Sequence, residues 1–97
     1  MSKKNIKPTL DGYDLEMPDK QMCLMALGNI IEPEEAEDLW QACCKDCGVS
    51  NNTENINELS KVFAAISRQG GAIGVLGRSL HTRAISYRIL DKMKNSK

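Results

Sequence analysis

The sequence predicts an all-α protein, built as a compact orthogonal bundle of four to five helices. Apolar residues recur at spacings of three and four over most of residues 18–94, and no segment shows the alternating pattern of a strand. Pro, Gly and Asn residues separate the periodic segments. With 97 residues, 41% of them apolar, the chain suits one globular domain. We expect an extended N-terminal arm (1–17), a single helical domain (18–94) and a flexible tail (95–97).

The first two helices are predicted over residues 18–30 and between Pro33 and Gly48. Pro18 suits a first helical turn, and Gly48 is typical of a residue that ends a helix. The expected apolar face of the first helix is Met22, Met25, Ala26, Leu27 and Ile30. That of the second is Ala36, Leu39, Trp40, Cys43 and Cys47. Trp40 should supply the largest single piece of core.

The third helix should begin after Asn55, since Glu58 three residues later makes a variant of the capping box. It should end near Gln69, before two glycines. Its apolar stripe is Ile56, Leu59, Val62, Phe63 and Ile66, and a fourth helix over residues 72–93 has the stripe Ile73, Leu76, Leu80, Ala84, Tyr87 and Leu90. Gly74 and Gly77 each weaken the fourth helix by about 1 kcal/mol, so a short helix followed by a longer one is an equal alternative.

Charge is unevenly distributed along a chain of zero net charge. Residues 1–60 carry five basic and twelve acidic residues, whereas residues 61–97 carry eight basic residues and only Asp91. In helical projection, basic residues and two isoleucines share an arc apart from the core stripe of the fourth helix. We expect a partner- or anion-binding surface there, formed by Arg78, His81, Arg83, Ile85, Arg88, Ile89 and Lys92. Alternatively, this second face packs on the N-terminal arm.

An acidic cluster at the start of the second helix is the counterpart of the basic arc. It consists of Glu32, Glu34, Glu35, Glu37 and Asp38. Acids in a first helical turn complement the helix dipole, so a solvated helix start is one interpretation. A clamp onto the basic helix, or contact with a partner, is the other.

The four cysteines are expected to be reduced core thiols. Cys43, Cys44 and Cys47 crowd into one helical segment and cannot cross-link distant parts of the chain. Cys44 and Cys47 have the spacing of a redox or zinc pair, but they lie at a helix end, where the dipole does not lower a thiol pKa. The chain also lacks a second closely spaced pair, so we expect no metal and no cofactor.

Two further patterns bear on function. The glycine-rich segment 70–79 precedes a helix, as phosphate-binding loops do, but it follows a helix and lacks the lysine and hydroxyl order of a nucleotide loop. Close helix packing through small residues is therefore the expected role, with a loose anion site at Arg78 as the alternative. His81 is the only histidine, and no serine elbow or paired-histidine motif accompanies it, so we expect no enzyme.

Residues 76–86 resemble the turn and recognition helix of bacterial helix-turn-helix regulators, with Leu76-Gly77 at the turn. The resemblance implies nucleic-acid binding through the basic helix. It covers less than a fifth of the chain, and Arg83 takes a position that this family keeps apolar, so no family is assigned.

The sequence therefore predicts a small, non-enzymatic interaction or regulatory protein that binds a protein partner, or a second copy, through its basic last helix. Nucleic-acid binding by the same helix is the alternative. No small-molecule substrate is indicated. No apolar run approaches the roughly 20 residues that span a bilayer, and no secretory signal is present, so we expect a cytoplasmic location without membrane contact.

Overall fold

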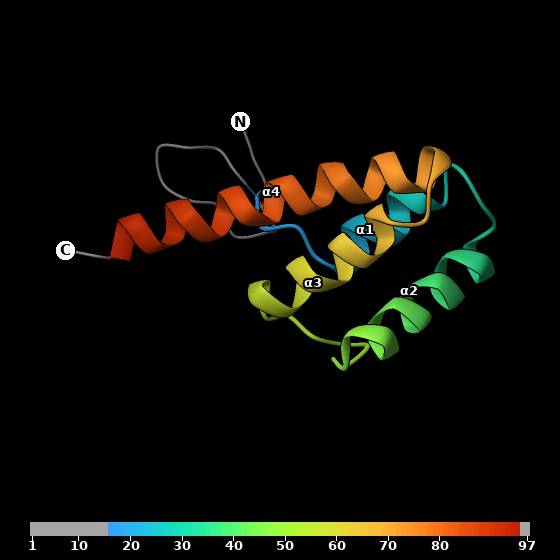
Figure 1. Ribbon diagram of the computed structural model, residues 1–97, viewed down its shortest axis with the longest axis horizontal. Coiled ribbons are helices and arrows are strands. Elements are labelled where there is room, and N and C mark those ends of the chain that lie inside the picture. The colour runs from blue at the N-terminus through green and yellow to red at the C-terminus, as the bar shows by residue number, and fades with distance from the viewer. Residues whose placement is uncertain (1–15, 96–97) are drawn as a thin grey trace, which may run out of the picture.

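The computed structural model describes residues 16–95, which fold into four helices (Figure 1). These are α1 (Lys20–Leu27), α2 (Pro33–Cys47), α3 (Ile56–Ser67) and α4 (Gly71–Asn95). The predicted all-α class is confirmed, as are the expected positions of α2 and α3. Residues 1–15 and 96–97, which include most of the expected arm and tail, lie outside the described residues. None of the described helices is both long enough and apolar enough to cross a membrane.

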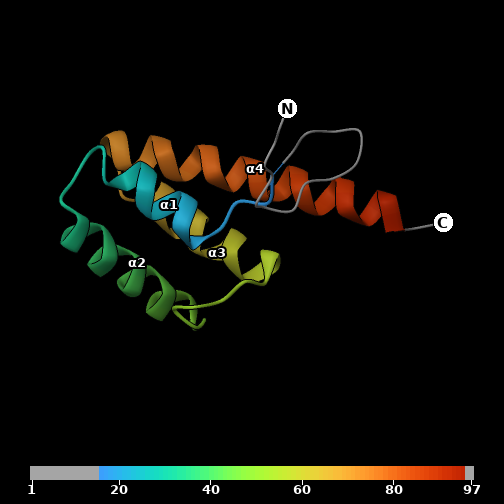
Figure 2. The same cartoon turned by 180° about the vertical axis from the view of Figure 1, so that it is seen from behind.

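Helices α3 and α4 form an antiparallel hairpin, the most extensive helix pair in the described chain (Figures 1 and 2). Gly70 and Gly71 join them in the left-handed region, with φ of 83° and 59°. This conformation is accessible to glycine at little cost. Helix α4 is continuous through Gly74 and Gly77, so the alternative of a short helix followed by a longer one is wrong.

Close packing against α3 explains why α4 tolerates Gly74 and Gly77. A Cβ atom at Gly77 would lie 2.4 Å from the backbone nitrogen of Ser67, and one at Gly74 would lie 3.1 Å from the Ser67 carbonyl oxygen. The missing side chains let the two backbones approach, which is the close-packing role expected for the glycine-rich segment. The packing that they permit offsets their low helix propensity.

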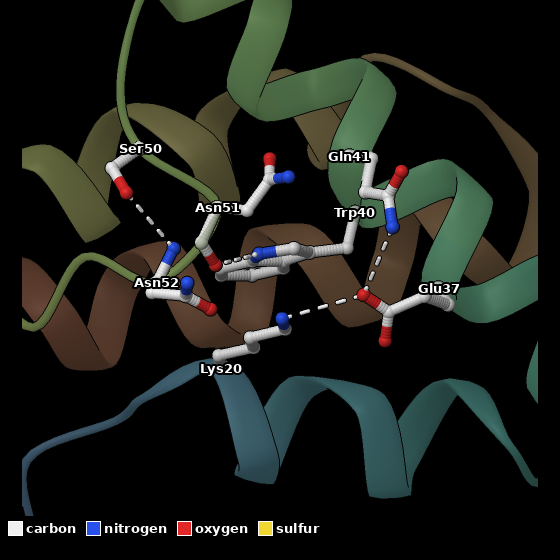
Figure 3. Close-up of polar contacts among 7 residues, drawn as sticks. All are labelled: Lys20, Glu37, Trp40, Gln41, Ser50, Asn51 and Asn52. Atoms are coloured by element: carbon white, nitrogen blue, oxygen red, sulfur yellow. Dashed lines mark hydrogen bonds and ion pairs between the residues drawn. The ribbon is translucent and has the colours of Figure 1, made fainter.

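The core lies where α3 is enclosed by the other helices. The buried apolar cluster is Cys23, Leu27, Ala36, Trp40, Cys43, Cys44, Leu59, Val62, Phe63, Ala65, Ile66, Leu80 and Ala84. Trp40 is fully buried, as predicted, and its ring centroid lies 6.2 Å from that of Phe63. Its indole N–H donates to the Asn51 carbonyl oxygen at 2.9 Å (Figure 3), so the one polar atom of the side chain has a partner.

Helix α1 differs from the expectation in both length and orientation. It spans only Lys20–Leu27, because the Asp19 carboxylate caps it by accepting from the Met22 amide at 2.9 Å. Cys23 and Leu27 form its buried pair, while Met25, expected in the core, is 67% exposed. Ile30 is 43% exposed because it follows the end of the helix. Met22 and Leu24 are partly buried against the same core, so the contact surface of this short helix is centred on Cys23 and Leu27 and leaves Met25 outside.

The start of α3 confirms Asn55 as the capping residue but modifies the expected box. Asn55 Oδ1 accepts from the amides of Asn57 and Glu58, at 2.9 and 3.2 Å. The Glu58 carboxylate accepts from the Thr53 hydroxyl instead of from the Asn55 amide, and that amide donates to Thr53 Oγ1 at 3.1 Å. The buried Thr53 hydroxyl therefore links Asn55 and Glu58 in the hydrogen-bond network that stabilises the first turn of α3.

Candidate functional site

Helix α4 has two faces of different character. Leu80, Ala84 and Tyr87 are buried on the face that packs into the domain. On the other face the basic residues of the predicted arc are exposed: Arg78, Arg83, Arg88 and Lys92. His81 and Ile85 are half-buried, and Ile89 is 54% exposed. The two-sector character expected from the sequence is therefore present, and Ile89 does not belong to the core.

A groove of about 700 Å³ lies between the first turn of α3 and the second half of α4. Among the described residues its lining is Ile56, Asn57, Ile85, Arg88, Ile89, Asp91 and Lys92. Three isoleucines give the groove an apolar component, and two exposed cations and one carboxylate lie among them. The structure thus brings four of the predicted site residues together in one concave surface.

Arg88 is a groove residue of α4 that forms a hydrogen bond to α3. Its Nη1 donates to the hydroxyl oxygen of Ser60 at 3.4 Å, and Ser60 is only 5% exposed. This bond lies across the interface between α3 and α4. A guanidinium group carries five N–H donors, so one bond to Ser60 leaves most of them for a ligand.

The remaining predicted residues, Arg78, His81 and Arg83, do not line the groove. Arg83 is directed toward α1, where its Nη1 lies 3.3 Å from the sulfur of Met22. Three lining residues were not predicted: Ile56, Asn57 and Asp91. Ile56 was assigned to the core stripe of α3, and it is half-buried at the end of that stripe. No pattern in the sequence shows that α3 begins opposite residues 85–92.

The acidic start of α2 does not lie at the groove. Figures 1 and 2 show α2 beginning toward the end of the molecule where α4 starts, whereas the groove lies along the second half of α4. Of the acidic cluster, Glu37 pairs with Lys20 of α1 at 3.3 Å (Figure 3). Hydrogen bonds from Gln41 and Lys20 lower the pKa of the Glu37 carboxyl. The alternative of a clamp onto the basic helix is therefore not formed at Arg88 and Lys92.

The four cysteines are free thiols, and Cys23, Cys43 and Cys44 are buried. Burial raises the pKa of Cys23 to about 12 and that of Cys44 to about 11, and the neighbouring thiols add to both shifts. Raised pKa values suppress the thiolate, which is the form that reacts and binds metals. Within residues 16–95, no group of three or more His, Cys, Asp or Glu side chains could hold a metal ion.

Residues 76–86 lie entirely inside α4, so the turn required by the helix-turn-helix resemblance is absent from the structure. At Gly77, where the resemblance places the turn, α4 is unbroken and lies against the backbone of Ser67. Comparison with known proteins adds no assignment: no protein-family model matches the chain, and no curated protein or solved structure is significantly similar to it.

Proposed function

We propose that this chain is a small, cytoplasmic, non-enzymatic interaction protein that binds a protein partner through the Arg and Ile sector of α4. The observation that carries the proposal is the groove, in which Ile85 and Ile89 lie beside Arg88 and Lys92. Interface centres are enriched in apolar residues and arginine, and they are poor in other charges. The expected orthogonal crossing of the helices stays a prediction, and the proposed binding does not depend on it.

Site-specific photo-crosslinking tests this function. A benzophenone amino acid replaces Ile89 in the full chain, and an extract of the source cells is irradiated with the purified protein. The matched control carries the same group in place of Val75, which is 58% exposed on the same helix but outside the groove lining. We expect a discrete, nuclease-resistant protein adduct from position 89 and none from position 75. The absence of any adduct at 89, or equal adducts at both positions, would contradict the proposal.

The nucleic-acid alternative rests on the row of exposed cations along α4. It predicts a nuclease-sensitive adduct at position 89. If about four phosphates are engaged, the affinity for nucleic acid should fall about 150-fold between about 50 and 200 mM salt. A protein partner should show a shallower dependence on salt, because apolar contacts carry part of its affinity.

A further inference from the structure

Helix α4 extends beyond the helix against which it packs. It has 25 residues and α3 has 12, which correspond to lengths of about 37 and 18 Å. Because the two helices meet at Gly70 and Gly71, the excess length of α4 lies at its C-terminal end (Figures 1 and 2). This end also carries two exposed large apolar residues, Ile89 and Met93. A second helix placed beside this end would contact Ile89 and Met93, which remain exposed next to α3.

The shape of the groove favours a helix over an extended strand as the occupant. The described residues of its walls belong to two helices, which offer no strand edge to which a peptide could add. From Ile85 to Lys92 the groove follows α4 over eight residues, an axial rise of about 10 Å. Apolar residues at i, i+3 or i+4, and i+7 of a docked helix span the same length, so three anchors match the isoleucine-lined floor.

The charges of the groove indicate an acidic partner. Arg88 and Lys92 of its lining are exposed, and Asp91 is the only acid among the described residues of the lining. A second copy of this chain docked by two-fold symmetry would bring these cations close to their own counterparts, which is unfavourable. For nucleic acid, the three isoleucines of the lining would offer no partner to the phosphates. Carboxylates on a partner helix would pair with Arg88 and Lys92, while the apolar face of that helix would contact the isoleucines of the groove.

We infer that the groove binds a short amphipathic helix, acidic on its flanks, supplied by a different protein. This inference rests on the proposed protein-binding function and specifies the chemistry of the partner. It concerns Ile56, Ile85, Arg88, Ile89 and Lys92, and it assigns no role in docking to Arg78, His81 or Arg83.

The test uses a fluorescent synthetic peptide of about 14 residues, with leucine at i, i+4 and i+7 and glutamate on the flanks. Fluorescence anisotropy measures its binding to the full chain. We expect saturable binding that weakens about tenfold or more in Arg88→Glu/Lys92→Glu and in Ile89→Asp. The matched controls are Lys45→Glu/Arg68→Glu, with the same charge change at exposed positions outside the groove, and Val75→Asp. Both should stay within about twofold of the wild type.

A charge-swapped peptide, with lysine in place of glutamate, should prefer the Arg88→Glu/Lys92→Glu variant to the wild type. Urea unfolding of each variant shows whether a loss of binding comes from a loss of folding. If Ile89→Asp greatly destabilises the free protein and the wild type does not bind the peptide, the groove is filled from within the chain and the inference is wrong. Light scattering that shows a dimer lost in Ile89→Asp would also overturn it, in favour of a second copy.

The two proposals fail separately. A nuclease-resistant adduct at position 89 without binding of the acidic peptide would keep the protein-binding function and reject the acidic helix. Peptide binding that the groove variants and their controls weaken equally would reject the groove as its location. If neither the adduct nor the peptide complex forms, both proposals are wrong.

Discussion

Gly77 of α4 lies directly against the backbone of Ser67 in α3: a Cβ atom added to Gly77 would lie 2.4 Å from the Ser67 backbone nitrogen. The neighbouring atoms are backbone atoms of α3, which cannot rotate away as a side chain can. The hairpin therefore depends on a residue without a side chain at this position.

Gly77→Ala should lower the free energy of unfolding by about 2 kcal/mol or more, although alanine is the better helix former. The control is Gly28→Ala, where the added Cβ would meet its nearest atoms at 3.4 Å in a right-handed backbone. That change should be neutral or stabilise by up to about 1 kcal/mol. Urea denaturation followed by circular dichroism measures both. Equal effects at the two positions would show that the helices are not in close contact at Gly77.

Trp40→Ala should cost about 3 to 5 kcal/mol of unfolding free energy, because a fully buried indole in contact with Phe63 is removed. This is a large part of the stability of a small domain. Met25→Ala, at a position that is 67% exposed, should cost less than about 1 kcal/mol. Since Trp40 is the only tryptophan, circular dichroism is the suitable probe. A loss below about 1 kcal/mol for Trp40→Ala would place the side chain at the surface.

The buried thiols predict a loss of stability at alkaline pH. The pKa of Cys23 is raised from 9.0 to about 12, and that of Cys44 from 9.0 to about 11. Above about pH 9 the unfolded chain releases protons that the folded chain retains, so their contribution is complete below pH 9 and is lost as pH rises toward 11 or 12. Wild type should therefore lose more stability between about pH 9 and 10 than Cys23→Ala/Cys44→Ala does. Parallel losses in the two proteins would contradict the shifted pKa values.

Thr53→Val should destabilise the protein by about 1 to 3 kcal/mol, because Thr53 Oγ1 both donates to Glu58 and accepts from the Asn55 amide in a buried position. Ser50→Ala is the control. Ser50 Oγ accepts from the Asn52 amide at 3.2 Å in an exposed turn (Figure 3), so water can replace it. That change should cost less than about 0.5 kcal/mol. Chemical denaturation of both variants measures these losses. Equal losses would show that the hydrogen bonds of Thr53 contribute no more to stability than the exposed bond of Ser50.

Helix boundaries with strong local signals were predictable from the sequence. Pro33 and Gly48 bound α2, and Asn55 caps α3, because these signals act within one turn of the chain. The stripe of α3 and the burial of Trp40 followed from periodicity alone. The limits of α1 did not, because a helix of eight residues contains too few periods to define a face.

The two sectors of α4, and the basic residues on its outer one, could be recognised from the spacing of residues 78–92. Local spacing determines which side chains share a side of a helix, and the sequence by itself determined that much. Only the tertiary structure decided that Ile56 and Asn57 complete the groove, that Arg83 turns toward α1 and that the acidic start of α2 lies elsewhere. These relationships join residues about 30 or more positions apart. The groove, for example, depends on how α3 and α4 are aligned along each other, and the close contact between Gly77 and Ser67 that accompanies this alignment has no signal in the local sequence.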